Sequence, residues 1–206
     1  WQFKNCVEGL IEACKVFETP VISGNVSLYN ESPNGPIYPT PTIGMVGIVN
    51  DISKVCTSWF KNNGDIILLL GETLDELGGS EYLKTIHGRI AGDAPALALK
   101  VEKALQDVVL SLVQKGLLQS AHDCSDGGLA VCLAECAIGN KEKQIGASLK
   151  LPKQSIRNDS LLFGETQSRI VVSAKPANAA KIQKLCQENG VPVLQLGKVG
   201  GKRLVI

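Results

Sequence analysis

Residues 65–71 read DIILLLG, an apolar run bounded by an aspartate and a glycine. Such a run is typical of a strand that is buried on both faces of its sheet. After it, segments with strand character alternate with segments that have the spacing of helices. This mixture predicts a layered α/β domain with a mixed sheet.

The segments expected around this strand have recognisable boundaries. The strongest helix is expected over residues 93–116, where Asp93 can cap, Pro95 suits the first turn and Gly116 suits the end. Residues 72–83 are polar and glycine-rich, and we interpret them as a loop that leads into a helix. The remaining elements are helices at 126–139 and 175–190, strands at 146–151 and 169–174, and two strands around a Gly-Gly turn within 191–206.

The first fifty residues have a different pattern. Residues 1–17 carry apolar side chains at three- and four-residue steps, which predicts a helix without an N-cap signal before it. Short strands are expected at 19–23 and 42–51, separated by a loop rich in proline, glycine and asparagine. We expect domains at 1–52, incomplete, and 53–206, and a sequence without an initiator methionine suggests a piece of a longer protein.

Charge and cysteine content exclude several classes of protein. The chain has 21 basic and 20 acidic residues, and this balance gives no footprint for nucleic acid or an anionic membrane. No apolar run approaches the ~18 residues that span a bilayer. The seven cysteines are interpreted as reduced core residues of a cytoplasmic protein. A thiolate metal site at Cys132, Cys136, Cys124 and His122 is disfavoured because no C-x-x-C pair is present.

The first candidate site is Gly24, Asn25 and Ser27, which follow a short apolar run. A glycine permits close approach of an anion, an asparagine offers a carbonyl oxygen to Mg²⁺, and a serine offers a hydroxyl to a substrate. Ser-Gly-Asn is also ordinary turn chemistry, so a plain turn stays an open alternative. The absence of a G-x-x-x-x-G-K-[ST] pattern excludes a P-loop here.

The second candidate site is the segment HDCSDGG, residues 122–128. Asp123 and Asp126 could hold a cation while the glycine amides at the helix start face a phosphate, with His122 as a neighbouring contact. Alternatively, Ser125 or Asp126 is simply the helix N-cap, a role that contributes about 1 kcal/mol.

The third candidate site is the segment GETQSR, residues 164–169, where Glu165, Thr166 and Gln167 precede an apolar strand. The alternative is a solvated loop with a Glu165–Arg169 ion pair, which contributes little at a surface.

Five phrases together resemble one family. PVISGNVSLYNE, PTPTIGMVGIV, GETLDELGGSEYL, HDCSDGGLAVCLAE and LLFGETQSRIVV are similar, in this order, to the second half of the phosphoribosylformylglycinamidine synthases. They cover nearly the whole chain. This family lies in the superfamily of aminoimidazole ribonucleotide synthetase. The resemblance implies a three-layer α/β/α domain of its C-terminal type, preceded by the tail of its N-terminal type, which contributes strands to a central barrel.

The resemblance also implies a reaction. The family converts formylglycinamide ribonucleotide and ammonia, derived from glutamine, to the amidine, with ATP activating the amide oxygen and ADP and phosphate released. By resemblance Gly24 contacts ATP, Asn25 ligates Mg²⁺ and Ser27 touches the ribonucleotide. By resemblance also, the auxiliary, non-catalytic nucleotide site contains His122, Asp123, Asp126, Glu165, Thr166 and Gln167.

The catalytic histidine of the family lies in the first half, so the resemblance implies that these 206 residues alone are inactive. The implied partners are that first half and, in the small form of the enzyme, a glutaminase subunit and a small accessory subunit. Two alternatives stay open: a non-catalytic nucleotide-binding or scaffold half, and another member of the superfamily. For selenophosphate synthetase or thiamine-monophosphate kinase, GNVSLYNE stands where those relatives carry a Gly-Gly-Glu-type motif.

Overall fold

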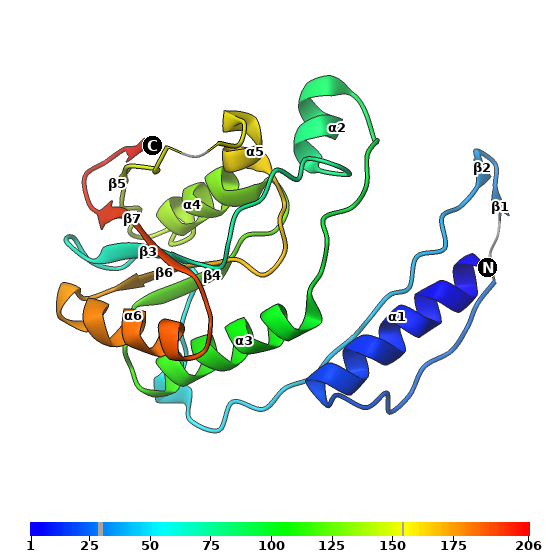
Figure 1. The fold of residues 1–206 in the computed structure, drawn as a ribbon, viewed down its shortest axis with the longest axis horizontal. Coiled ribbons are helices and arrows are strands. Elements are labelled where there is room, and N and C mark those ends of the chain that lie inside the picture. The colour runs from blue at the N-terminus through cyan, green and yellow to red at the C-terminus, as the bar shows by residue number, and fades with distance from the viewer. Residues whose placement is uncertain (29–30, 154) are drawn as a thin grey trace. The chain divides into compact units, whose positions relative to one another are not determined.

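The computed structural model describes residues 1–28, 31–153 and 155–206. The chain divides into two units, residues 1–50 (unit 1) and residues 51–206 (unit 2), and each is described by itself. Figure 1 shows their elements in the order of the chain. The segment Gly-Asn-Val-Ser, residues 24–27, lies in unit 1. Tyr29 and Asn30, which belong to the longer phrase PVISGNVSLYNE, lie outside the described residues.

Unit 2 is built on a six-stranded sheet with the order β4-β6-β3-β7-β5-β8. All neighbours in it are antiparallel except β5 and β8, which are parallel, so the predicted mixed sheet is confirmed. The strands are β3 (Ile66–Leu70), β4 (Ser120–Asp123), β5 (Ala147–Leu149), β6 (Ile170–Ala174), β7 (Val193–Val199) and β8 (Leu204–Val205).

Strand β3 lies inside the sheet, and all five of its residues are buried. Successive side chains of a strand point to opposite faces. Accordingly Ile67 and Leu69 belong to one hydrophobic cluster, and Ile66, Leu68 and Leu70 belong to the other. Each such side chain stabilises the fold by about 1.5–3 kcal/mol when it is fully buried. The prediction of a strand buried on both faces is therefore confirmed.

Helices cover both faces of the sheet, which gives the three layers expected (Figure 1). Helix α4 (Gly128–Ile138) contributes Leu129, Cys132 and Leu133 to the cluster that contains Ile67. Helices α3 (Leu99–Gln114) and α6 (Ala179–Glu188) contribute Leu105, Leu112 and Ile182 to the cluster that contains Leu68.

Some helix boundaries differ from the prediction. Helix α3 begins at Leu99 and not near Asp93, because the backbone of Asp93 packs against Gly78 and the amide of Ala96 donates to Glu76, 3.0 Å away. The polar loop does lead into a helix, α2 (Glu81–His87), capped by the Ser80 side chain. Short elements that the sequence pattern did not indicate are α5 (Asn158–Phe163) and the 3-10 turns η1 (Ile52–Lys54) and η2 (Pro176–Asn178).

Unit 1 contains helix α1 (Gln2–Phe17) and a short hairpin of β1 (Glu31–Ser32) and β2 (Gly35–Pro36). The predicted helix is confirmed. The strands expected at 19–23 and 42–51 are wrong, since no partner strand pairs with either segment in the part of the chain that the structure describes. None of the described residues of unit 1 is buried. In residues 1–28, 31–153 and 155–206, no helix is long and apolar enough to cross a membrane.

Candidate functional site

Three connections meet at one edge of the unit 2 sheet. Ile170, the first residue of β6, pairs with Leu70 at the end of β3 and with Asp123 at the end of β4. The loops after β3 and β4 and the loop before β6 therefore share this edge. Both unit 2 segments that the sequence marked as candidate sites lie there.

His122 and Asp123 end strand β4. The Nδ1 atom of His122 lies 2.9 Å from the Asp123 carbonyl oxygen, and its Nε2 atom lies 3.3 Å from a carboxylate oxygen of Glu135 in α4. The His122 side chain is largely buried. The ring therefore joins the end of β4 to α4, and Glu135 is a contact that sequence reasoning missed because nothing local pairs it with His122.

The Asp123 carboxylate accepts a hydrogen bond from the Ser125 hydroxyl. This bond is the largest cause that holds the pKa of Asp123 below its usual value, while partial burial opposes it. Asp123 and Asp126 both remain exposed. The Asp-x-Ser spacing, typical of a local side-chain turn, is the sequence signal that could have identified this contact.

The start of α4 differs from both interpretations of the sequence. Its N-cap is Gly127 in a left-handed conformation, φ 79°, so the expected capping by Ser125 or Asp126 is wrong. The two glycine amides are also engaged, because Gly127 N donates to Glu165 Oε1 (2.8 Å) and Gly128 N donates to the Ser125 carbonyl (3.0 Å). Both amides expected to face a phosphate are therefore satisfied by the protein.

Glu165 and Thr166 connect the loops at this edge. Besides Gly127, Glu165 Oε1 accepts the amide of Glu81 at 2.9 Å. The Thr166 hydroxyl accepts the amide of Leu74 at 3.2 Å. Gln167 is exposed and donates from Nε2 to the Glu165 carbonyl at 3.0 Å. The structure thus brings Glu165 and Thr166 to the β4–α4 loop and to the loop after β3.

Arg169 is not the surface partner of Glu165 that one interpretation expected. It is 2% exposed, and burial lowers its pKa. Its guanidinium donates to the carbonyl oxygens of Thr166 (2.9 Å) and Gly164 (2.6 Å) and to the Thr73 hydroxyl (3.2 Å). The expected solvated ion pair is wrong, because the Arg169 side chain is buried and bonds the backbone of the loop that precedes β6.

Gly24, Asn25 and Ser27 lie in unit 1 and are exposed. The Ser27 hydroxyl lies 3.4 Å from the Asn25 amide oxygen. A side chain at Gly24 would meet no other atom within 4 Å, so the protein itself does not require a glycine there. The amide and hydroxyl oxygens fit a hard cation and a polar ligand, but they form too few ligands for a complete site.

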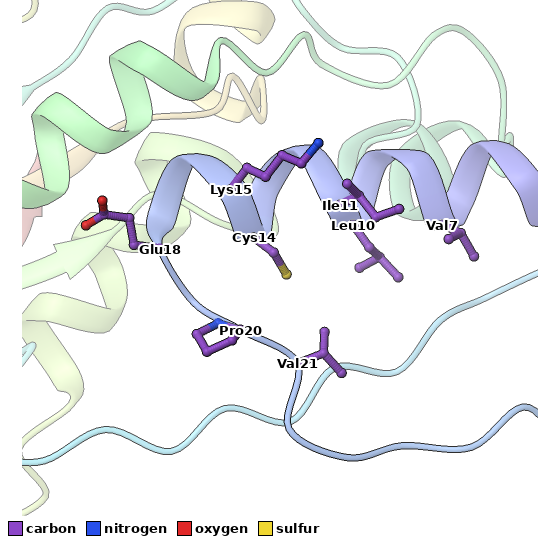
Figure 2. A pocket seen from close by; sticks show the side chains of 8 residues that line it. All are labelled: Val7, Leu10, Ile11, Cys14, Lys15, Glu18, Pro20 and Val21. Carbon is purple, nitrogen blue, oxygen red and sulfur yellow. The ribbon is translucent and has the colours of Figure 1, made fainter.

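A groove of about 550 Å³ lies along α1 (Figure 2). It is mostly apolar, and Figure 2 shows side chains of the helix above Pro20 and Val21. Its lining residues are Val7, Leu10, Ile11, Cys14, Lys15, Glu18, Pro20 and Val21. None of the residues singled out from the sequence lines this groove.

The described residues contain no group of three or more His, Cys, Asp or Glu side chains that could hold a metal ion. Four of the seven cysteines are buried, namely Cys124, Cys132, Cys136 and Cys186, whereas Cys6, Cys14 and Cys56 are partly exposed. The neighbouring thiol of Cys132, together with burial, raises the pKa of Cys124, and burial raises the pKa of Cys186 to about 11.

Comparison with known proteins finds a family match for each unit. Residues 62–206 match the family "AIR synthase related protein, C-terminal domain", and residues 1–49 match "AIR synthase related protein, N-terminal domain". A similar curated protein is the phosphoribosylformylglycinamidine synthase subunit PurL of Anaeromyxobacter sp. (strain Fw109-5). It is 54% identical over 213 residues, 100% of this chain and 28% of that protein. The chain thus spans about a quarter of the length of this relative.

Solved structures agree in fold. T. maritima PurL complexed with FGAR has a TM-score of 0.62 and 20% identity over 72% of this chain and 26% of the other. T. maritima PurL complexed with ATP has a TM-score of 0.56 and 20% identity over 73% of this chain and 24% of the other. With the three-layer domain and both family matches in chain order, the chain belongs to the AIR synthase related family.

Proposed function

We propose that this chain is part of a phosphoribosylformylglycinamidine synthase, an ATP-dependent carbon–nitrogen ligase of purine biosynthesis. The observation that carries the proposal is the 54% identity with a PurL subunit along the entire chain. The reaction converts formylglycinamide ribonucleotide and ammonia to the amidine, with ADP and phosphate as products. Complexes of similar proteins with ATP and with FGAR support this choice of substrates.

In this proposal Gly24, Asn25 and Ser27 work in a site that other parts of the enzyme complete. Asn25 would hold Mg²⁺ through its amide oxygen, and Mg²⁺ would supply neutralisation of phosphate charge. Gly24 leaves the backbone accessible to ATP, and the Ser27 hydroxyl is free to turn from Asn25 to the ribonucleotide.

The remaining assignments follow from the same family membership. The domains expected at 1–52 and 53–206 correspond to the tail of the family's second N-type domain and to its second C-type domain. The 206 residues alone are inactive and need the first half of the synthetase. A glutaminase subunit and a small accessory subunit are the further partners of the small form, and the cytoplasm is the expected location.

A chimaera tests the proposal. The 206 residues replace the matching segment of the Anaeromyxobacter subunit, and FGAR- and ammonia-dependent release of ADP is measured with the partner subunits present. We expect a working enzyme. A folded chimaera without turnover, in a preparation where the parent subunit is active, contradicts the proposal.

Asn25→Ala in the chimaera should lower kcat/KM by about tenfold or more and raise the Mg²⁺ concentration required, because a phosphate-bound cation loses a ligand. Asn34→Ala is the matched control, since it removes another exposed asparagine of unit 1. Equal kinetics for the two variants would remove Asn25 from the metal site and leave the ligase assignment intact.

A second function is favoured by the edge of the unit 2 sheet, where the connections that meet carry exposed Asp123, Asp126 and Gln167, with His122 next to Asp123. We propose an auxiliary nucleotide site there, with Glu165 and Thr166 holding its backbone. Titration calorimetry of the 206-residue chain with ADP and Mg²⁺ should show binding that Asp126→Asn weakens. Absence of binding to the wild-type chain, with unit 2 folded, would contradict this function.

A further inference from the structure

One carboxylate oxygen at the sheet edge bonds the starts of two helices. Glu165 Oε1 accepts the amide of Glu81, the first residue of α2, at 2.9 Å and the amide of Gly127, the N-cap of α4, at 2.8 Å. The first amides of a helix have no partner within the helix, and a negative charge near them is stabilising. The Glu165 carboxylate therefore fills the place that an external anion would take at both helix starts.

The backbone on both sides of Glu165 is held by hydrogen bonds, which restricts the position of the Glu165 carboxylate. Arg169 donates to the carbonyl oxygens of Gly164 and Thr166, which flank Glu165. The Thr166 hydroxyl is hydrogen-bonded to Leu74 N. Gly164 itself packs against the carbonyl oxygens of Ser160 and Glu76, where a larger residue would collide. A buried arginine and a buried threonine thus hold the glutamate in place.

The start of α4 is close-packed against the same segment. Gly128 has φ 67°, and a Cβ atom on it would collide with the Gly164 carbonyl and with Phe163. The Gly128 amide donates to the carbonyl oxygen of Ser125, and the Ser125 hydroxyl donates to the Asp123 carboxylate. The position of Gly127 therefore sets the position of the short loop that carries Asp123, Ser125 and Asp126.

We propose that Glu165 is a positioning residue that acts as a built-in anion. Its carboxylate connects the β4–α4 loop to the start of α2. It thereby fixes the distance between the loop that carries Asp123 and Asp126 and the loop after β3. The residue acts through Gly127 and Glu81 and does not touch a ligand itself. A phosphate could use these two amides only by displacing the carboxylate. Only the consequence for nucleotide binding rests on the auxiliary site proposed above.

Amide hydrogen exchange of the 206-residue chain, read residue by residue by NMR, tests the proposal. In Glu165→Ala we expect the amides of Glu81 and Gly127 to exchange about tenfold faster or more, because each loses a charge-assisted hydrogen bond. In Glu165→Gln the two amides should exchange faster than in the wild type but more slowly than in Glu165→Ala, since the neutral amide oxygen can still accept both bonds but lacks the charge. Glu188→Ala is the control, because the Glu188 carboxylate forms an exposed ion pair with Lys184 on α6.

Formate supplies the missing carboxylate. Added to Glu165→Ala, it should slow the exchange of Glu81 and Gly127 again, with no change in Glu188→Ala. Unchanged exchange at the two amides in Glu165→Ala, or a uniform rise at all protected amides of unit 2, would overturn the proposal. If Glu165→Ala does not fold, Glu165→Asp gives the same test, because its side chain is shorter. Protection of the Glu81 and Gly127 amides equal to that in the wild type overturns the proposal, and a loss of protection at these two amides alone supports it.

Titration with ADP separates this proposal from the auxiliary nucleotide site. If the wild-type chain binds ADP, Glu165→Ala should weaken binding several-fold and formate should restore it. If the wild-type chain does not bind ADP, the auxiliary site is contradicted, and the exchange of Glu81 and Gly127 still decides the role of Glu165.

Discussion

Units 1 and 2 contain similar apolar side chains but use them in opposite ways. In unit 2, both faces of β3 are closed by helices, and Leu68 is completely buried. In unit 1, Leu28 and Ile48 are 74% and 87% exposed, and no described residue is buried. Apolar content alone therefore does not make a core: the residues must also have a facing layer.

The largest expected effect comes from separating the units. Residues 51–206 alone should unfold cooperatively, with a melting temperature within about 3 °C of that of the 206-residue chain, because they contain both hydrophobic clusters. Residues 1–50 alone should show no cooperative transition. Circular dichroism against temperature and urea measures both. A sharp transition for residues 1–50 would break the comparison, since it would require a core that the structure does not show.

A matched pair of leucine substitutions sharpens the same comparison. Leu68→Ala should lower the free energy of unfolding by about 2–5 kcal/mol, because it leaves a cavity in the middle of the sheet. Leu28→Ala should change it by less than about 0.5 kcal/mol, since this side chain is already exposed. Urea denaturation followed by circular dichroism gives both values. Similar losses for the two variants would show that unit 1 shares the stability of unit 2.

The same contrast explains how much of the fold the sequence could predict. The strand in DIILLLG was predicted because a strand that is buried on both faces is marked by a local apolar run. The helices after it were predicted because helical spacing and end signals are local as well. The strand expected at 42–51 failed because a strand also needs a partner, which a local pattern cannot supply. The start of α3 was misplaced because a contact with Gly78, distant in sequence, holds Asp93 in a loop.

The candidate site shows the same limit. Clusters of polar residues at strand ends marked the segments around Asp123 and Glu165 as two separate candidate sites, and only the family resemblance assigned them to one site. The structure brings both segments to one sheet edge. Their contacts could not be predicted, because Glu165 and Gly127 are 38 residues apart and the bond uses a backbone amide, which every sequence offers. The burial of Arg169 was missed for a similar reason: its partners are carbonyl oxygens, which leave no mark in the sequence.

The smallest expected effect concerns two Asp-x-Ser pairs, one at the junction of the units and one at the sheet edge. Hydrogen bonds from Ser53 and Ser125 are the largest causes that lower the pKa of Asp51 and Asp123, respectively. A carboxyl group whose folded pKa lies below its unfolded value contributes stability above that unfolded value, 3.8 here, and loses it as the pH falls through the folded pKa. The stability of the chain should therefore decrease below about pH 4 in part through Asp123.

Ser125→Ala should raise the pKa of Asp123 and lower the free energy of unfolding at about pH 6 by at most about 0.5 kcal/mol, because the Asp123 side chain is 71% exposed and solvent screens it. Ser53→Ala should raise the pKa of Asp51 in the same direction without a measurable loss of stability, since Asp51 stands in an exposed turn. Carboxyl chemical shifts against pH report both pKa values, and urea denaturation at about pH 6 and about pH 3 reports stability. An equal stability loss in both variants would mean that the Ser125–Asp123 hydrogen bond at the sheet edge stabilises the fold no more than the Ser53–Asp51 hydrogen bond in an exposed turn. A loss confined to Ser125→Ala would show that this loop is held by the layers of unit 2, as the contacts of Gly127 and Gly128 require.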